Sequence, residues 1–328
     1  MAENKQSNHL LEIRDLVIHY ETEDGVVEAI NRISLDISSG EAVGLVGETG
    51  AGKTTIGLAV MGLLPIPPAH IIQGSIRFDG QEITGMTEKQ LRKLRGNQIS
   101  MIFQDPMTAL NPTMTVVKQI MEVIKLHNHM DDAQARAHAV KMLSLVGIAE
   151  GRADNYPHEF SGGMKQRVVI AMALACNPKL LIADEPTTAL DVTIQAQVLQ
   201  LMKELQDETG TALLVITHDF GIVADICSKC AVIYAGEIVE YGTLEDIFDH
   251  RQHPYTIGLF NSIPSLDEDV ERLRPIKGLM SDPMNLPSHC SFYDRCDHAC
   301  EQCKNTDPAL TEVTPGHFVK CILARKEN

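Results

Sequence analysis

The chain has 328 residues, 44% of them hydrophobic, so it can form a large core in two domains or in one domain with an appendage. Its 28 Lys and Arg residues against 44 Asp and Glu residues give a formal net charge of −16, which argues against nucleic acid as a partner. We find no signal peptide and no uninterrupted apolar run of membrane-spanning length. We therefore expect a soluble cytoplasmic chain whose eight cysteines are reduced thiols or metal ligands rather than disulfides.

The N-terminal residues are predicted to form β-strands. Segments 10–20 and 26–37 have the loosely alternating pattern of strands, and Glu23-Asp24-Gly25 between them is typical of a hairpin turn. Tyr20 is one of six tyrosines in a chain without tryptophan, so it is a candidate for stacking on a nucleotide base. Ordinary packing within the strand is the alternative for a single tyrosine.

A phosphate-binding loop is predicted at residues 47–54, which fit the pattern G-x-x-x-x-G-K-[ST] at every fixed position. A short buried strand is predicted before it at 41–46 and a helix after it from residue 55, which is the context that such a loop requires. The glycines let backbone N–H groups wrap around a polyphosphate, and the helix N-terminus adds partial positive charge. Lys53 can reach the β- and γ-phosphates, and the Thr54 hydroxyl can bind Mg²⁺. A Gly-rich turn without a ligand is the alternative.

The next segments predict further strands and a helical insertion. Strands are predicted at 74–80 and 99–103, with a short basic helix at 88–95 between them. Gln104 follows the second strand, where a glutamine can bind Mg²⁺ or orient water, although this signal is weak by itself. Helical periodicity then indicates that residues 106–176 form an insertion that is mainly helical.

A second helix start with anion-binding character is predicted at Ser161-Gly162-Gly163, ahead of a long apolar helix that runs to residue 176. The serine can cap the helix, and the glycines leave N–H groups exposed. A simple capped helix without a ligand is the alternative.

Two later strands end in residues that suit phosphate chemistry. The apolar strand from residue 180 ends in Asp184 and Glu185, which could hold a metal shell and polarise an attacking water. After an amphipathic helix at 193–208, the strand at 212–217 ends at His218. Such a histidine is usually packed in the protein, but near a triphosphate it can bond the γ-phosphate instead.

The character of the chain changes after about residue 242. A hairpin is predicted at 231–241 and a short helix at 244–249, and His253-Pro254-Tyr255-Thr256 then opens a proline-rich tail that holds five of the eight cysteines. Cys227 and Cys230 lie at C-x2-C spacing, but they precede a predicted core strand, so we interpret them as packing residues rather than as a redox pair.

Taken together, these motifs resemble the ATP-binding-cassette (ABC) ATPases over nearly the whole chain. The resemblance implies an α/β phosphate-loop fold with a mixed central sheet, an N-terminal antiparallel β subdomain and a helical subdomain. We expect the nucleotide-binding domain at residues 8–252, its helical subdomain at about 106–176, and a small Cys-rich C-terminal extension at 253–328. The signature departs from the commonest Leu-Ser-Gly-Gly-Gln form at Phe160 and Met164, but its Ser-Gly-Gly is intact.

The resemblance implies that two ATPase subunits meet head to tail and bind ATP between them. The phosphate loop of one chain holds the ATP, and the signature helix start of the other chain covers it. Tyr20 matches the aromatic residue that stacks on the base, and the turn Ala189-Leu190-Asp191 matches the loop between subunits. The other residues matched to nucleotide binding are Gly47, Glu48, Thr49, Gly50, Ala51, Gly52, Lys53, Thr54, Thr55, Gln104, Ser161, Gly162, Gly163 and Asp184.

The resemblance also assigns catalytic and metal-binding roles. Glu185 matches the general base and His218 the γ-phosphate switch, with Lys53 on the phosphates. Gln104 matches the residue that touches both Mg²⁺ and the membrane partner, and Thr54 is the other expected Mg²⁺ ligand.

The tail is similar to that of the peptide importer ATPases, of oligopeptide, dipeptide and nickel type. In that subfamily, cysteines at the spacing of Cys290, Cys296, Cys303 and Cys321 can hold a [4Fe–4S] cluster, which we therefore expect here. A four-thiolate zinc site and plain buried thiols are the alternatives. Cys300 is extra to the subfamily pattern and could compete with Cys303 as a ligand.

The resemblance implies an ATP-hydrolysing subunit of a membrane importer for peptides, dipeptides in particular, or for a related small solute. Its expected partners are a second ATPase, by preference a paralogue in a heterodimer, two membrane permease subunits and, indirectly, an extracytoplasmic solute-binding protein. We expect the chain to be peripheral, on the cytoplasmic face of the membrane, with no nucleic-acid partner.

Other functions within the superfamily fit the sequence less well. A chromosome-maintenance ATPase would need a very long coiled coil, and the segment between Gln104 and Ser161 is too short for one. A translation-associated ATPase would need two cassettes, and only one phosphate loop is present. An inactive structural partner is disfavoured because Lys53, Glu185 and His218 are all present.

Overall fold

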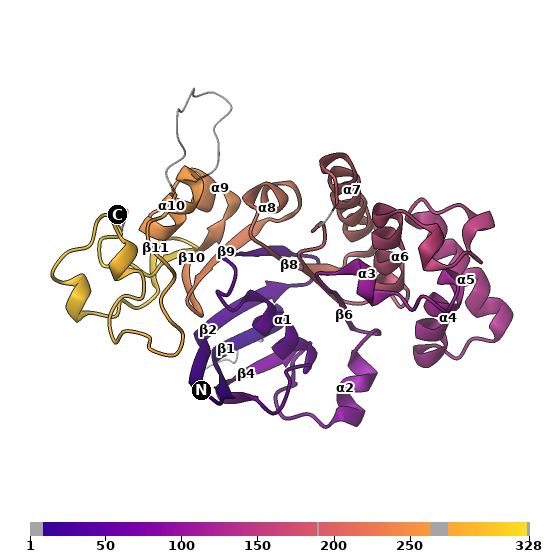
Figure 1. The fold of residues 1–328 in the computed structure, drawn as a ribbon, viewed down its shortest axis with the longest axis horizontal. Helices are drawn as coiled ribbons and strands as arrows, with labels where there is room; N and C mark the ends of the chain where they lie inside the picture. The colour runs from indigo at the N-terminus through magenta and orange to yellow at the C-terminus, as the bar shows by residue number, and fades with distance from the viewer. Residues whose placement is uncertain (1–8, 189, 263–274, 327–328) are drawn as a thin grey trace, which may run out of the picture.

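The computed structural model describes residues 9–188, 190–262 and 275–326, which form two β-sheets, a helical part and a C-terminal extension (Figure 1). The first sheet is antiparallel, with the strand order β2-β1-β4-β5. Tyr20 on its first strand pairs with Val27 and Ala69 on the two neighbouring strands. The strands of this sheet are β1 (His9–Thr22), β2 (Gly25–Ser38), β4 (Ala69–Phe78) and β5 (Gln81–Glu82).

The central sheet is mixed, as the sequence predicted, and among the described residues its order is β11-β12-β10-β9-β3-β8-β7-β6. The strands from β9 to β6 are parallel, so the carboxyl ends of β3, β7 and β8 lie at one edge, where ligands bind in open α/β sheets. Its first six strands in the chain are β3 (Ala42–Val46), β6 (Ile99–Ile102), β7 (Leu180–Asp184), β8 (Ala212–Thr217), β9 (Lys229–Tyr234) and β10 (Glu237–Thr243).

Two apolar cores cover the faces of the central sheet, because successive side chains of a strand point to opposite faces. Val43 and Leu45 of β3 belong to the core shared with the antiparallel sheet, whereas Ala42 and Val46 belong to the core shared with the helical part. The helices outside the helical part are α1 (Lys53–Met61), α2 (Glu88–Leu94), α7 (Val192–Thr209), α8 (Phe220–Ile226), α9 (Leu244–Phe248) and α10 (Pro254–Asn261), of which α1, α8 and α9 pack directly on the strands.

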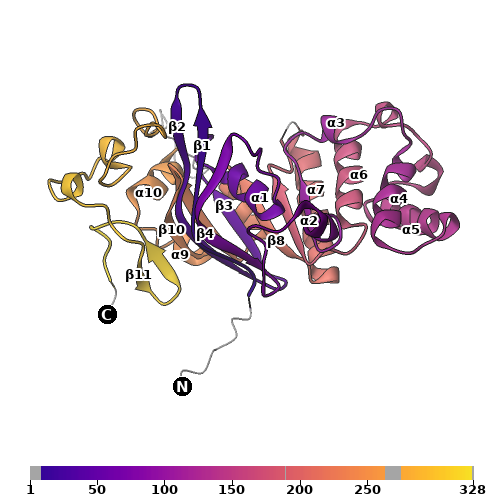
Figure 2. The same ribbon diagram turned by 90° about the horizontal axis from the view of Figure 1, so that it is seen from below.

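The helical part is inserted between β6 and β7 and lies at one end of the molecule (Figures 1 and 2). Its helix α6 packs on α7 and connects this part to the central sheet. The helical part consists of α3 (Pro106–Ala109), α4 (Val116–His127), α5 (Asp132–Leu145) and α6 (Gly162–Leu174).

The C-terminal extension, residues 275–326, lies at the opposite end of the molecule from the helical part (Figures 1 and 2). It contains a hairpin of β11 (Thr311–Thr314) and β12 (His317–Val319), which the sequence did not predict. The hairpin continues the central sheet, because β12 pairs with β10, and the buried His317 contacts the buried Glu240 carboxylate at 3.0 Å. Among the described residues, no helix is both long and apolar enough to cross a membrane.

Candidate functional site

The phosphate loop lies between the end of β3 and the start of α1. A β-carbon on Gly47 would lie 2.2 Å from the Ile233 carbonyl oxygen, so the loop passes too close to β9 for any side chain there. Gly50 and Gly52 have φ values of +86° and +100°, in the left-handed region that favours glycine. The sequence pattern and the fold therefore agree on where glycine is required.

Lys53 lies at the centre of this loop, with only 6% of its surface exposed. Its ammonium donates to the Gly47 carbonyl at 2.7 Å and to the Glu48 carbonyl at 3.0 Å. Burial lowers the pKa of Lys53, and the carboxylates of Glu185, Asp184 and Glu48 oppose this effect. The loop thus places a cation among three acidic side chains, where it could pair with phosphate groups.

Asp184 is the last residue of β7 and is 3% exposed. Burial raises the pKa of its carboxyl, and a hydrogen bond from the Thr54 side chain counteracts the rise. The structure therefore brings together the hydroxyl and the carboxylate that the sequence predicted to hold Mg²⁺, and hydroxyl, carboxylate and water oxygens are the ligands that this ion takes.

Glu185 connects several segments of the site. One carboxylate oxygen, Oε1, lies 3.0 Å from Nδ1 of His218, and the other, Oε2, accepts from Gln104 Nε2 and from the Thr188 hydroxyl, each at 2.9 Å. Burial alone would raise the pKa of Glu185, but the hydrogen bonds from His218 and Thr188 outweigh it and hold the pKa below 4.5. The φ of Glu185 is +45°, a conformation that is costly for a residue with a side chain and often found at functional sites.

A cavity of about 180 Å³ opens beside the phosphate loop. Gly50, Gly52, Thr54 and Thr55 line it, together with residues of β2 and of the C-terminal extension. Tyr20 is not one of its lining residues; its side chain is half-buried against the core of the antiparallel sheet. The structure thus places Thr55 with the loop and leaves the stacking role of Tyr20 as a prediction.

The signature residues lie elsewhere, at the start of α6. Ser161 caps this helix by accepting from the Met164 amide at 3.4 Å, as the sequence predicted. A β-carbon on Gly163 would lie 2.3 Å from Ile194 of α7, so close packing requires glycine there. Both Ser161 and Gly162 are exposed. The neighbours of this helix start come from α7 and not from the phosphate loop of the same chain.

The turn after Glu185 is only partly described. Ala189 lies outside the described residues. Leu190 approaches Gly162, and Asp191 caps α7 by accepting from the Ile194 amide at 3.0 Å. The described part of this turn therefore adjoins the start of α6, where the signature lies.

The sequence did not reveal two residues that hold the phosphate loop from outside. The Tyr255 hydroxyl accepts from the Glu48 amide at 3.0 Å, and Arg295 donates to both oxygens of the Glu48 carboxylate at 2.7 and 3.0 Å. Tyr255 stood within a motif that the sequence singled out, but no pattern indicated its contact with the loop. Apart from its position beside Cys296, nothing in the sequence pointed to Arg295 as a residue that contacts the loop.

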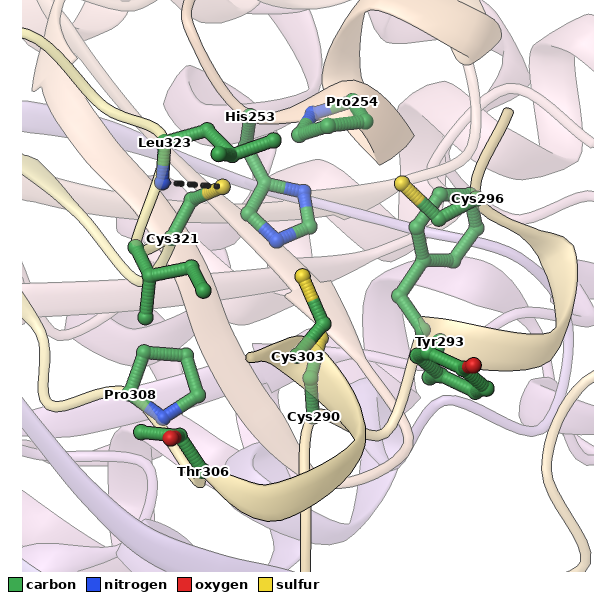
Figure 3. A pocket seen from close by; sticks show the side chains of 12 residues that line it. His253, Pro254, Cys290, Tyr293, Cys296, Cys303, Thr306, Pro308, Cys321 and Leu323 are labelled. Carbon is green, nitrogen blue, oxygen red and sulfur yellow. Dashed lines mark hydrogen bonds between the residues drawn. The ribbon is translucent and has the colours of Figure 1, made fainter. Parts of the chain in front are cut away.

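The expectation of a [4Fe–4S] cluster at Cys290, Cys296, Cys303 and Cys321 is wrong. These cysteines line one cavity together with Pro254, Pro308 and Leu323 (Figure 3), yet the described ranges contain no group of three or more His, Cys, Asp or Glu side chains that could hold a metal ion. The cavity is apolar and measures about 20 Å³, roughly the space of one water molecule.

Burial raises the pKa of Cys290 to about 11 and also raises the pKa values of Cys296, Cys303 and Cys321. Cys300 Sγ lies 3.4 Å from Cys303 Sγ, beside the four cysteines that line the cavity. Cys227 and Cys230 are buried in the core, in agreement with a packing role.

Comparison with known proteins identifies the two parts of the chain. Residues 30–188 match the family described as "ABC transporter", and residues 239–303 match "Oligopeptide/dipeptide transporter, C-terminal region". The chain is 50% identical to the oligopeptide transport ATP-binding protein OppD of Escherichia coli (strain K12), over 97% of this chain and 94% of that protein. It is 45% identical to the dipeptide transport ATP-binding protein DppD of the same strain, over 95% of this chain and 96% of that protein.

A solved structure shares the fold. The dimeric post-hydrolysis structure of the ATP-binding cassette MJ0796, bound to ADP and Pi, superposes with a TM-score of 0.65 at 27% identity, over 71% of this chain and 98% of that one. With the near-complete match to the relatives above, the chain belongs to the ABC transporter family of ATP-binding proteins, in the group that carries the oligopeptide/dipeptide transporter C-terminal region.

Proposed function

We propose that this chain binds and hydrolyses ATP as the energy-supplying subunit of a membrane importer for oligopeptides or dipeptides. The observation that carries the proposal is the meeting of Lys53, Asp184 and Glu185 at the carboxyl edge of the central sheet, beside the phosphate loop. The relatives that match the whole length of the chain are named for oligopeptide and dipeptide transport, which supports the solute class.

The reaction is transfer of the γ-phosphoryl group of ATP to water. Glu185 acts as the general base: its lowered pKa keeps the carboxylate ionised at neutral pH, ready to accept a proton from an attacking water. His218 and Gln104 hold that carboxylate through its two different oxygens. Lys53 and the loop amides stabilise the charge on the phosphates, while Tyr20 stacks on the adenine.

Mg²⁺ is the metal that the acidic edge fits, with Thr54, Asp184 and Gln104 as the residues around it. Bound there, the ion would neutralise charge on the β- and γ-phosphates. The Thr54 side chain is close enough to the Asp184 carboxyl to lower its pKa, so both groups lie at the same edge of the site.

A second ATPase completes the site. Ser161 and Gly162 are exposed at the start of α6, with the buried Gly163 beside them, which suits contact with nucleotide bound to another chain. The dimeric cassette with the same fold supports this head-to-tail arrangement. By preference, the second subunit is a paralogue and the pair is a heterodimer.

Membrane permease subunits form the pore, and a solute-binding protein delivers the peptide to them from outside. The chain acts at the cytoplasmic face as a peripheral subunit.

We assign residues 8–252 to the nucleotide-binding domain, with a helical subdomain at about 106–176, and residues 253–328 to a small Cys-rich extension. The packing of the described hairpin β11–β12 on β10 supports an extension that is continuous with the main sheet.

The test is phosphate release by the complex of this chain with its membrane subunits, supplied with ATP, Mg²⁺ and solute-loaded binding protein. We expect hydrolysis that oligopeptides or dipeptides stimulate, and none when Glu185→Gln replaces the wild-type chain. A complex that releases no phosphate from ATP would overturn the proposal, and hydrolysis without stimulation by any peptide would overturn its solute class.

A further inference from the structure

The C-terminal extension contacts the phosphate loop through an ion pair between a buried arginine and a half-buried glutamate. Both terminal nitrogens of Arg295 donate to Glu48, the second residue of the loop, at 2.7 and 3.0 Å. The third donor group, Nε, donates to the Lys277 carbonyl at 2.9 Å, and the arginine side chain is only 6% exposed. Each of the three guanidinium nitrogens thus donates one hydrogen bond, and the two to Glu48 have the paired geometry that arginine forms with a carboxylate.

Aromatic residues fix this arginine in place. Its guanidinium lies 5.7 Å from the ring centre of Tyr234 and 5.9 Å from that of Phe292. Tyr255 packs on both rings, and its hydroxyl accepts the Glu48 amide at 3.0 Å. The backbone and the side chain of Glu48 are therefore held independently, by residues of α10 and of the extension.

The extension also reaches the cavity at the loop. Met280, Ser281 and Pro283 line it opposite Gly50 and Thr54, and a β-carbon on Gly50 would lie 3.3 Å from the end of Met280. The Pro283 carbonyl accepts the Glu28 amide at 2.8 Å, which anchors this segment to β2. One wall of the cavity beside the phosphate loop thus comes from the C-terminal extension.

The charge of Glu48 explains why an arginine is needed here. The Glu48 carboxylate is close enough to Lys53 to raise the pKa of its ammonium, and Asp184 and Glu185 place two more carboxylates nearby. An unpaired carboxylate in the loop would repel the anionic phosphates, most strongly where burial weakens screening by water. Pairing with Arg295 offsets this charge through two hydrogen bonds to the carboxylate.

We propose that the C-terminal extension forms part of the nucleotide site and that Arg295 is a positioning residue for ATP, which acts by neutralising the Glu48 carboxylate beside the bound phosphates. This inference rests on the proposed function, because it assigns the extension a role in binding the same nucleotide. Arg295 acts through Glu48 and has no role in the chemical step.

The test measures the Kd of fluorescent N-methylanthraniloyl-ATP with Mg²⁺ for the full-length chain, at low and at high salt. Arg295→Met should raise the Kd about tenfold at low salt, and the increase should shrink at high salt because the repulsion is screened. Glu48→Gln should change the Kd in the opposite direction, by about threefold, because Arg295 then has no carboxylate to neutralise. A purely structural anchor would make both variants bind more weakly.

The double variant Glu48→Gln/Arg295→Met should bind more tightly than Arg295→Met, because no unpaired carboxylate remains. Arg325→Met is the matched control: it removes an exposed arginine from the same extension and should leave the Kd at the wild-type value. If Arg295→Met does not fold, the direction of the change in Glu48→Gln decides the question.

Three results would overturn the inference: an Arg295→Met Kd within twofold of wild type, weaker binding by Glu48→Gln, or a double variant no better than Arg295→Met. Failure of the wild-type chain itself to bind the nucleotide would instead overturn the proposed function, so the two failures are distinguishable.

Discussion

Glu185 Oε1 lies 3.0 Å from Nδ1 of His218, so the residue that follows β7 contacts the residue that follows β8. Gln104, after β6, donates to the other oxygen of the same carboxylate. Three strand ends that are distant in the sequence therefore converge on one side chain. These contacts fix the Glu185 carboxylate, and the hydrogen bonds from His218 and Thr188 lower its pKa, so substitution of this residue tests its role most directly.

Glu185→Gln should retain ATP binding and lose turnover. The amide keeps the size of the side chain but cannot accept a proton, so we expect phosphate release to fall by roughly 10²- to 10⁴-fold. The measurement is phosphate release by the membrane complex, with nucleotide binding followed in parallel. Thr188→Ala is the companion variant: it removes one hydrogen bond to the same carboxylate and should slow turnover far less. Hydrolysis by Glu185→Gln near the wild-type rate would exclude this residue as the base.

Lys53→Ala should lose tight nucleotide binding. The Lys53 ammonium lies inside the phosphate loop, where it donates to two loop carbonyls. A charge-assisted contact between this ammonium and a phosphate contributes about 2–3 kcal/mol to the free energy of binding. We therefore expect the Kd for ATP to rise by roughly 30- to 150-fold in an equilibrium titration. Lys179→Ala removes an exposed lysine that pairs with Asp79, outside the site, and should bind ATP normally. Equal affinities for Lys53→Ala and wild type would contradict the phosphate-loop assignment.

The parts of the fold that were predicted correctly are formed by residues that are neighbours in the sequence. A strand, a Gly-rich loop and a helix around Lys53 form one run of residues, and the two adjacent carboxylates Asp184 and Glu185 lie at the end of β7. The hairpin turn at residues 23–24 and the end of α7 at Gly210 were equally local. Each of these features depends on backbone conformation or hydrophobic pattern within about ten residues, which the sequence expresses directly.

The features that the sequence did not predict depend on long-range packing. Arg295 meets Glu48 across 247 positions, and the pairing of β12 with β10 joins two short strands that have weak patterns of their own. For the cysteine tail, the sequence led to a wrong prediction of a metal cluster. The spacing of cysteines along the chain does not fix the distances between their thiols in space. Cys290 and Cys321 share a cavity whose size is set by the proline, leucine and phenylalanine side chains around it.

Gln166→Leu should weaken the link between the signature helix α6 and the segment that follows β7. Gln166 is 1% exposed, and its amide donates to the Pro186 carbonyl at 2.5 Å, directly after Glu185. Leucine would leave that carbonyl without its donor, at a cost of about 1–3 kcal/mol in the free energy of unfolding. Urea denaturation measures this loss, and the ATPase rate should fall with it because Glu185 is less firmly held.

Gln200→Leu provides the control for this change. Gln200 lies exposed on α7, where the same substitution should alter the free energy of unfolding by less than about 0.5 kcal/mol. If Gln166→Leu proves as stable as Gln200→Leu, the hydrogen bond to Pro186 contributes nothing measurable to stability.

The ion pair of Glu41 with Lys229 should make stability depend on acid pH. Glu41 Oε1 lies 2.7 Å from Lys229 Nζ, and its Oε2 accepts from the Ser38 amide at 2.7 Å, just before the strand that leads into the phosphate loop. Burial opposes ionisation of Glu41, but the hydrogen bonds from Lys229 and Ser38 outweigh it and hold the pKa of the carboxyl below 4.5.

Because the pKa is depressed in the folded state, the stabilisation is fully present above pH 4.5 and is lost as the pH falls through the folded-state pKa. Glu41→Gln should therefore lower the free energy of unfolding by about 1 kcal/mol at neutral pH and by progressively less in acid. Urea denaturation across this range measures the difference, and Glu208→Gln, which removes an exposed carboxylate on α7, is the control. If the gap between Glu41→Gln and wild type stayed constant from neutral to acid pH, the ion pair would not be the source of the pH dependence.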